Sequence, residues 1–126
     1  EGPAPRAARM TPAGDLLPVG SLAELHALLA AQPAVLVYFS TPDCRVCQAL
    51  RPKVAELLAR DFPRLSGLYV DCAALPDAAG QYQVFSVPTM IGFFEGREWR
   101  RWGRSVGLEE IRSGLDRPYG LIFAER

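Results

Sequence analysis

The chain has 126 residues, a common size for one compact domain, and 49% of them are hydrophobic, enough for a single buried core. The 14 lysines and arginines balance 14 aspartates and glutamates, so no overall charge attracts nucleic acid or an anionic membrane. The longest apolar run, residues 34–39, is far shorter than the roughly 20 residues of a membrane-spanning helix. We therefore expect one domain whose partners include neither a membrane nor nucleic acid.

Composition divides the chain into three parts. Residues 1–14 are rich in alanine, proline and arginine without apolar periodicity, so we expect a flexible arm there. Residues 15–116 form the expected domain, and residues 117–126 an extension whose apolar side chains pack back on it. The expected location is the cytoplasm, or the periplasm or the exterior if an upstream signal has been removed.

The first half of the domain predicts helix, strand and helix. A capping box followed by leucines at helical spacing predicts a helix over residues 21–30. Residues 34–39 are continuously apolar and β-branched, which is typical of a strand buried on both faces. After a turn, apolar residues at spacings of three and four predict a second helix that begins at Cys44.

The second half predicts a strand over 65–71, a short helix over 75–82, strands over 87–95 and 97–102, and a final helix over 108–115. A tight turn between the last two strands indicates an antiparallel hairpin. Strands that alternate with helices before the hairpin indicate parallel pairing. The predicted fold class is therefore α/β, with a mixed central β-sheet flanked by helices on both faces.

Cys44 and Cys47 lie three positions apart at the start of the second helix. Backbone N–H groups and the helix dipole favour a thiolate there, so Cys44 is predicted to be an acidic, exposed nucleophile. Cys47 follows nearly one turn later on the same side, close enough to form a disulfide, and is predicted to be the resolving thiol. The spacing and its context favour redox chemistry. A structural zinc half-site and a coincidental pair of buried thiols stay open as alternatives.

A structural zinc site needs four ligands, and the remaining candidates, Cys72 and His26, do not form a second closely spaced pair. We therefore predict no metal and no other cofactor. Cys72 follows the predicted strand over 65–71, at the sheet edge where Cys44 is expected. We interpret it as a small buried hydrophobe rather than a regulatory thiol, and His26 as a surface residue.

The chain resembles the thioredoxin family from about residue 16 to residue 115. The resemblance rests on Cys44-Arg45-Val46-Cys47 after an apolar strand, Pro52 in the following helix, Val87-Pro88 before the next strand, and glycines at positions 96 and 103. It implies a thioredoxin fold and disulfide exchange, as a monomer, with protein thiols or disulfides and a reductase or oxidase partner. It also implies that Pro88 is a cis-proline beside the cysteines and that Val87 and Pro88 contact substrate.

Two departures from the family surround Cys44. Asp43 stands where thioredoxins usually carry tryptophan, and Arg45-Val46 replaces their Gly-Pro. We predict that Asp43 and Arg45 tune the thiol in opposite directions. Because the helix start and Arg45 act together, the pKa of Cys44 is expected below the ordinary value of about 8.5.

Two further departures concern Cys47. The family's buried acid corresponds to Tyr38 and its partner lysine to Gly67, so no dedicated proton acceptor for Cys47 is evident. These departures keep a second function open beside the oxidoreductase: a thioredoxin-fold binding or chaperone module with little catalytic activity.

Arginines interleave with Trp99 and Trp102 over residues 97–104. Such a segment could bind single-stranded nucleic acid by stacking and charge. A charged edge strand explains the pattern without a ligand, and the balanced net charge favours that interpretation.

Overall fold

The computed structural model describes residues 15–124, so the arm expected over 1–14 lies outside the described residues. Its elements follow one another as β1 (Leu17–Pro18), α2 (Leu22–Ala31), β2 (Ala34–Ser40), α3 (Arg45–Asp61), β3 (Ser66–Asp71), α4 (Pro76–Gln81), β4 (Thr89–Phe94), β5 (Arg97–Trp102) and α5 (Leu108–Phe123). The predicted order of helices and strands is confirmed, with a short first strand in addition.

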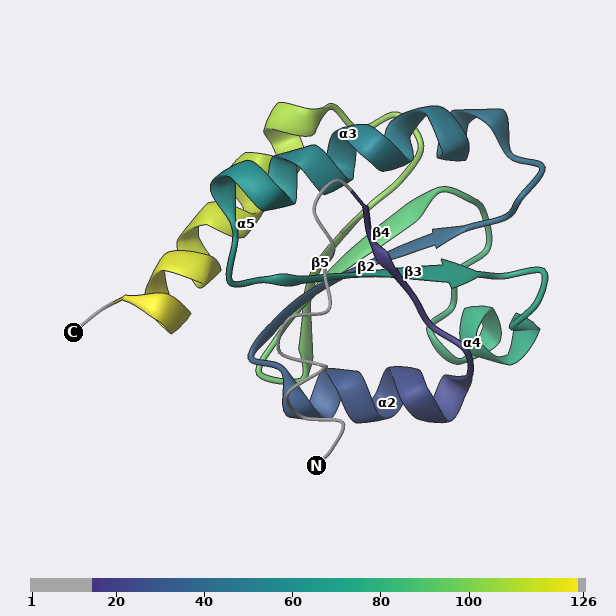
Figure 1. Ribbon diagram of the computed structural model, residues 1–126, viewed down its shortest axis with the longest axis horizontal. Coiled ribbons are helices and arrows are strands. Elements are labelled where there is room, and N and C mark those ends of the chain that lie inside the picture. Colours follow the sequence, from purple (N-terminus) through teal and green to yellow (C-terminus); the bar gives the residue numbers. More distant parts are fainter. Residues whose placement is uncertain (1–14, 125–126) are drawn as a thin grey trace.

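The strands form one mixed sheet in the order β1-β3-β2-β4-β5. Strand β2 pairs in parallel with β3 and antiparallel with β4, and β5 closes the hairpin as an edge strand. Parallel strands end at the same edge of a sheet, so the residues that follow β2 and β3 lie side by side (Figure 1). This edge places the candidate site.

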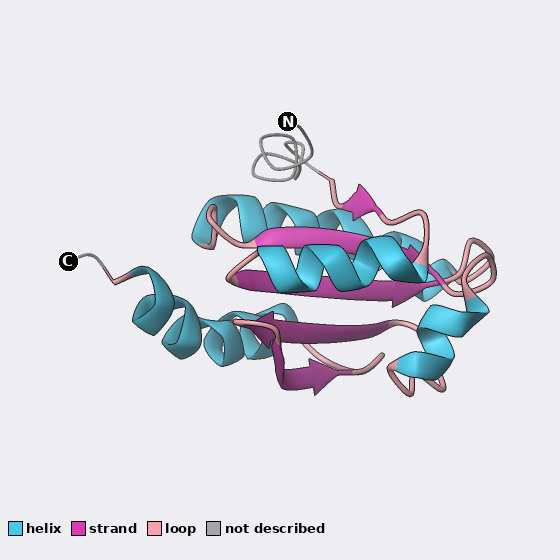
Figure 2. Ribbon diagram, turned by 90° about the horizontal axis from the view of Figure 1, so that it is seen from below, coloured by secondary structure: helices cyan, strands magenta, loops and turns pink. Residues whose placement is uncertain are grey.

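Helices cover both faces of the sheet, as predicted. Helices α3 and α5 lie on one face, and α2 and α4 lie on the other (Figures 1 and 2). Every residue of β2 is buried, because alternate side chains enter the two hydrophobic layers. Tyr38 belongs to the layer under α3, and its neighbours Val37 and Phe39 belong to the layer under α2.

Local signals explain where two elements begin and turn. Ser21 caps α2 by accepting the Glu24 backbone N–H at 3.0 Å, and the Glu24 carboxylate accepts the Gly20 N–H at 2.7 Å. The β4–β5 turn has positive φ at Glu95 (54°) and Gly96 (82°), the backbone of a two-residue hairpin turn.

Helix α5 continues well past residue 115, where the sequence predicts its end. Pro118 has no backbone N–H and leaves the Gly114 carbonyl without its helical donor. The Trp99 indole N–H fills that position, at 2.9 Å from the Gly114 oxygen. A strand side chain therefore replaces the missing hydrogen bond, and the helix runs on to Phe123.

The last turns of α5 pack on the body, as expected for the chain's end. Tyr119 lies edge-on against Phe62, with ring centroids 5.0 Å apart, and its hydroxyl accepts the Arg64 backbone N–H at 3.0 Å. Leu121 points to solvent with 66% of its surface exposed.

Packing accounts for the mixture of arginine and tryptophan in β5. Trp102 is buried with 7% exposure. The Arg101 guanidinium forms an ion pair with Glu98 at 2.8 Å and donates to the Tyr82 and Gln83 carbonyls at 3.0 and 3.2 Å. Trp102 thus packs in the cluster that includes α5, and Arg101 forms hydrogen bonds with the loop after α4.

No helix within residues 15–124 is both long and apolar enough to cross a bilayer.

Candidate active site

The two clustered cysteines lie at the N-terminal end of α3, and the preceding turn explains why the helix begins there. The Thr41 hydroxyl donates to the Asp43 carboxylate at 2.9 Å, and the Thr41 carbonyl accepts the Cys44 N–H at 3.2 Å. Cys44 is the N-cap residue, and its sulfur accepts the Cys47 backbone N–H at 3.1 Å. The helix start thus directs an N–H group toward the Cys44 sulfur, as the sequence predicts.

Cys44 and Cys47 form a disulfide with their Cα atoms 5.2 Å apart. The predicted pairing is confirmed. The two residues differ in access, because Cys47 is fully buried at 0% exposure whereas Cys44 is partly exposed. An incoming thiol or disulfide can reach the Cys44 sulfur, and Cys47 can react only with a group already attached to Cys44.

Both charged neighbours of Cys44 are exposed. Arg45 is the first residue of α3, and Asp43 is held by its hydrogen bond to Thr41. The structure places both beside Cys44, and their effect on its thiol stays a prediction.

The Val87–Pro88 peptide bond is cis, as the family resemblance implies. Val87 packs against the same hydrophobic cluster as Cys44. The Val87 carbonyl accepts a hydrogen bond from the Arg104 guanidinium at 3.3 Å, a contact that sequence reasoning missed. The only sign of this contact in the sequence is an arginine at position 104, shortly after the predicted strand over 97–102. The roles of Val87 and Pro88 in substrate binding stay predictions.

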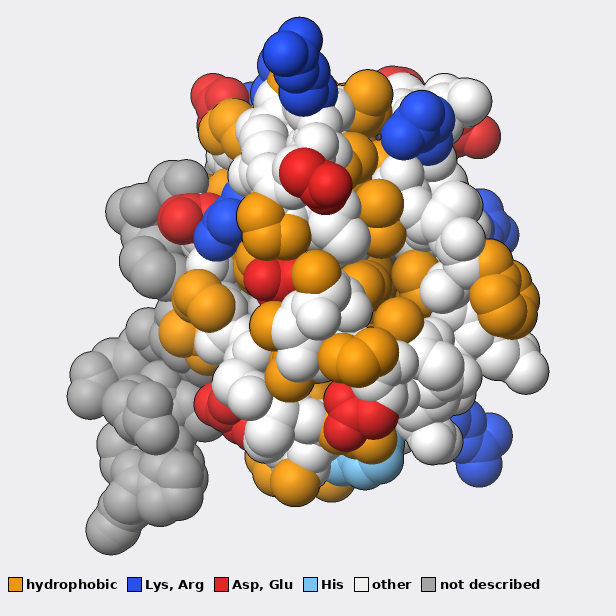
Figure 3. Space-filling view, turned by 90° about the vertical axis from the view of Figure 1, so that its right-hand side faces the viewer, with side chains coloured by type: hydrophobic (Ala, Val, Ile, Leu, Met, Phe, Trp, Pro, Cys, Tyr) orange, Lys and Arg blue, Asp and Glu red, His pale blue; other side chains and the backbone are white. Residues whose placement is uncertain are grey.

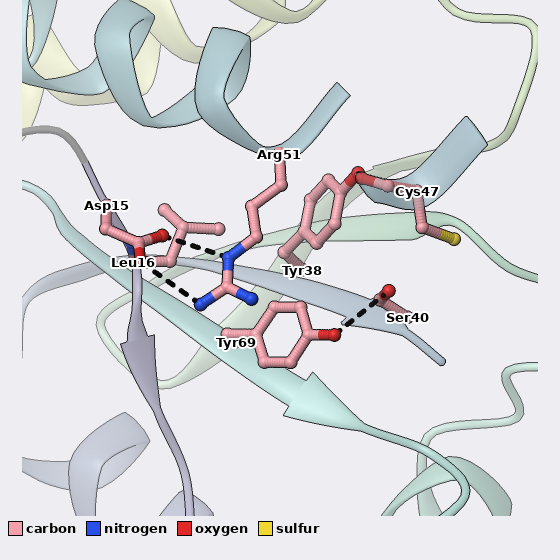
Figure 4. Close-up of polar contacts among 7 residues, drawn as sticks. All are labelled: Asp15, Leu16, Tyr38, Ser40, Cys47, Arg51 and Tyr69. Carbon is pink, nitrogen blue, oxygen red and sulfur yellow. Dashed lines mark hydrogen bonds and ion pairs between the residues drawn. The ribbon is translucent and has the colours of Figure 1, made fainter. Parts of the chain in front are cut away.

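A layer that contains Tyr38 and Tyr69 lies next to Cys47, between β2, β3 and α3 (Figure 4). The Tyr38 hydroxyl donates to the Cys47 backbone carbonyl at 2.6 Å. Its ring stacks on Tyr69, with centroids 6.2 Å apart and planes 21° apart. The Tyr69 hydroxyl donates in turn to the Ser40 hydroxyl at 3.2 Å. The hydrogen bond to Cys47 and the ring stack on Tyr69 hold the Tyr38 hydroxyl against the first turn of α3.

Arg51 closes this layer on the solvent side. Its guanidinium lies over the Tyr69 ring, 3.7 Å from the centroid, and pairs with the Asp15 carboxylate at 2.9 Å. Burial, followed by the neighbouring Tyr69, raises the pKa of the Tyr38 hydroxyl well above its ordinary value, and Arg51 opposes this by less. Tyr38 therefore stays a neutral hydrogen-bond donor at neutral pH.

Cys72 lies just after β3, at the sheet edge that also carries Cys44, as predicted. Its backbone N–H donates to the Ser40 carbonyl at 2.8 Å. The thiol is free and half-buried, and packs against the cluster under α2 and α4, whereas Cys47 belongs to the cluster under α3 and α5. Burial raises the pKa of the Cys72 thiol, which lowers its reactivity at neutral pH.

His26 is exposed on α2, as expected, with its ring 5.9 Å from that of Tyr82. Within residues 15–124, no three or more histidine, cysteine, aspartate or glutamate side chains are grouped to hold a metal ion.

The face toward which β2 and β3 point carries a band of hydrophobic side chains, with acidic groups among them and basic groups toward the rim (Figure 3). Val46, between the two cysteines, is 42% exposed, and Phe85, two residues before Val87, is 90% exposed. An exposed apolar side chain therefore lies between the two cysteines at Val46, and a second lies at Phe85.

The thioredoxin family model matches residues 21–117. A thioredoxin-like protein of Bacillus subtilis, YdfQ, is 30% identical over 107 residues, which cover 80% of this chain and 95% of the relative. The thioredoxin of Chlamydia trachomatis is 41% identical over 80 residues, 64% of this chain and 74% of the relative. Among solved structures, Fasciola hepatica thioredoxin is 26% identical with a TM-score of 0.72, covering 81% of this chain and 98% of that one.

The matched region includes the cysteine pair, the sheet edge that holds it and the Val87–Pro88 bond. The predicted thioredoxin fold is confirmed. The chain belongs to the thioredoxin family, and its Cys44–Cys47 pair makes it a thiol–disulfide oxidoreductase.

Proposed function

We propose that Cys44 is the nucleophile and Cys47 the resolving thiol in exchange with the disulfides of protein substrates. The observation that carries this assignment is the unequal access to one disulfide: Cys44 is partly exposed at a helix N-cap, and Cys47 is completely buried behind it. A helix N-cap favours thiolate at Cys44, and the burial of Cys47 reserves it for the second step.

The reaction takes two exchanges. The Cys44 thiolate attacks one sulfur of the substrate disulfide, a Cys44–substrate bond forms, and the other substrate sulfur leaves as a thiolate that takes a proton from solvent. The Cys47 thiolate then attacks the Cys44 sulfur, and the second substrate sulfur leaves. The substrate gains two electrons, and the protein is left with its Cys44–Cys47 disulfide. The reverse sequence oxidises a dithiol.

Two features support a protein substrate. Val87 packs against the same hydrophobic cluster as Cys44, and an extended segment of a substrate could pair with the backbone at Val87 and Pro88 as an added strand. The exposed side chain of Val46, between the two cysteines, and that of Phe85, two residues before Val87, offer apolar contacts. A protein segment that carries an apolar residue close to its cysteine matches both.

Turnover requires a partner that supplies two electrons to the oxidised pair, or one that removes them in the opposite direction. A reductase or an oxidase with its own reactive thiols fits this requirement. We propose that the chain acts as a monomer, because the disulfide and the Val87–Pro88 backbone come from the same chain.

Turnover of a peptide disulfide with dithiothreitol as electron donor tests the assignment. Wild type is expected to accelerate the reduction, and Cys44→Ser is expected to lose the acceleration entirely. Cys47→Ser is expected to perform the first exchange and then turn over slowly. Equal rates for wild type and both variants would instead favour a binding module in which the cysteines have little catalytic importance.

A further inference from the structure

The Tyr38–Cys47 hydrogen bond joins the sheet directly to the resolving cysteine. Both residues are completely buried at 0% exposure, and the hydroxyl lies 2.6 Å from the carbonyl oxygen. A short hydrogen bond between buried groups is more costly to leave unmade than one in solvent. The bond therefore restrains the backbone of Cys47.

The helix around Cys47 depends on this restraint more than an ordinary helix would. Pro52 lies inside α3 and cannot donate to the Gln48 carbonyl four residues earlier. The turn that carries Cys44 and Cys47 is thus less firmly attached to the rest of α3 than a regular helical turn. Tyr38 holds this turn from the sheet side, one residue before the carbonyl that the proline leaves without a helical donor.

The charged and titratable groups that face Tyr38 are Tyr69 on β3 and Arg51 on α3, with Asp15 behind Arg51. None of these groups is a carboxylate in contact with Cys47. Among residues 15–124, the buried polar side chains apart from tyrosine are the hydroxyls of Ser40, Ser66 and Thr89. Because Tyr38 itself stays protonated, this layer offers hydrogen-bond donors and no base for the Cys47 thiol.

We propose that Tyr38 is the positioning residue for the resolving step: its hydroxyl holds Cys47 in line with the Cys44 sulfur, and the Cys47 proton passes to solvent base. This inference rests on the roles proposed above for the two cysteines. In the step, the Cys47 thiol loses its proton to hydroxide or buffer, its sulfur bonds to the Cys44 sulfur, and the Cys44–substrate bond breaks. The substrate thiolate leaves with the electron pair and takes a proton from solvent.

Two measurements test the proposal on the reduced protein mixed with a peptide disulfide, quenched in acid and resolved by mass spectrometry. The first compares Tyr38→Phe with wild type. Loss of the hydroxyl is expected to slow resolution of the mixed disulfide about fivefold while its formation changes by less than about twofold.

Tyr69→Phe is the matched control, because it removes a hydroxyl from the same layer that bonds Ser40 rather than Cys47. Both of its rates are expected within about twofold of wild type. Equal slowing of both steps by Tyr38→Phe, or the same slowing of resolution by Tyr69→Phe, would mean that the layer acts only through general stability and would overturn the proposal.

The second measurement uses wild type and needs no variant to fold. The rate of resolution is expected to rise tenfold per pH unit up to the pKa of Cys47, with no inflection at lower pH. An additional inflection on the acid side would reveal an internal base and contradict the proposal. Failure of the reduced Cys47→Ser variant to hold the peptide on Cys44 would instead refute the cysteine roles, so the two failures are distinguishable.

Discussion

Helices α3 and α5 lie on the same face of the sheet, and each contains one internal proline. In α5 the Gly114 carbonyl, which Pro118 deprives of its donor, accepts a hydrogen bond from Trp99 on β5. That bond repairs the helix at the position where the proline breaks it. It has no connection with the cysteines.

In α3 the hydrogen bond from the sheet reaches the residue before the carbonyl that lacks a helical donor. Pro52 deprives the Gln48 carbonyl, yet the side chain from the sheet, Tyr38, donates to Cys47. Each helix contains a proline and accepts one hydrogen bond from the sheet. In α5 this bond reaches the carbonyl that lost its donor, and in α3 it reaches the cysteine proposed to react. The comparison separates a bond that serves stability from a bond that serves chemistry.

The largest expected effect on stability lies in the packed part of α5. Leu115 is completely buried, so Leu115→Ala is expected to lower the free energy of unfolding by about 3 kcal/mol through lost burial and a cavity. Urea denaturation measures the loss, and Leu121→Ala, at a site that is 66% exposed, is the control with little change. Disulfide exchange per folded molecule is expected to stay at the wild-type rate. A slower exchange in folded Leu115→Ala would show that α5 affects the chemistry as well as the stability.

Trp99→Phe sharpens the comparison, because it removes the donor from the Gly114 carbonyl and keeps an aromatic ring in place. The free energy of unfolding is expected to fall by about 1 kcal/mol, the usual contribution of one hydrogen bond. Urea denaturation and the single-turnover exchange assay are the measurements. Slower resolution of the mixed disulfide without any loss of stability would show that α5, too, acts on the chemistry.

Charge reversal beside the nucleophile is expected to change rates rather than stability. Arg45→Glu replaces a cation near the Cys44 sulfur by an anion, which disfavours the thiolate, and alkylation of reduced Cys44 at neutral pH is expected to slow about threefold. Asp43→Asn is expected to do the opposite. Arg97→Glu, exposed at the β4–β5 turn, is the control for net charge. An unchanged alkylation rate in Arg45→Glu would show that Arg45 does not influence the Cys44 thiol.

The smallest effect is expected at Cys72, on the other face of the sheet. Because burial raises the pKa of its thiol in the folded protein, the folded state keeps this proton to higher pH than the unfolded chain. Its contribution to stability is fully present below the unfolded-state pKa and is lost as the pH rises through the folded-state pKa. Unfolding in urea measured between about pH 7 and 10 follows this loss, which Cys72→Ala should abolish while keeping exchange activity within about twofold. Strongly reduced exchange in Cys72→Ala would assign this thiol a catalytic part.

Local sequence was sufficient for most elements. The apolar run of β2, the helical spacing after Cys44 and the turn before β5 each depend on near neighbours, and these elements appear where they were predicted. The predicted end of α5 was wrong. A proline normally stops a helix, and here the hydrogen bond that compensates for it comes from Trp99, on a strand that precedes α5 in the sequence.

The candidate site divides in the same way. The spacing of Cys44 and Cys47 is a local pattern, and it predicted the disulfide. The contact of Tyr38 with Cys47 crosses from a strand to a helix, and that of Arg104 with Val87 joins two loops. No periodicity encodes such contacts, since they arise only when the sheet brings the segments together.

The position of the mixed disulfide in Cys47→Ser tests the central claim most directly. The reduced variant is mixed with a peptide disulfide, digested and sequenced by mass spectrometry to find which cysteine carries the peptide. Cys44 is predicted to carry it almost completely, because a helix N-cap favours its thiolate whereas burial raises the pKa of the Cys72 thiol. A peptide attached mainly to Cys72 would contradict the assignment of the chemistry to the start of α3.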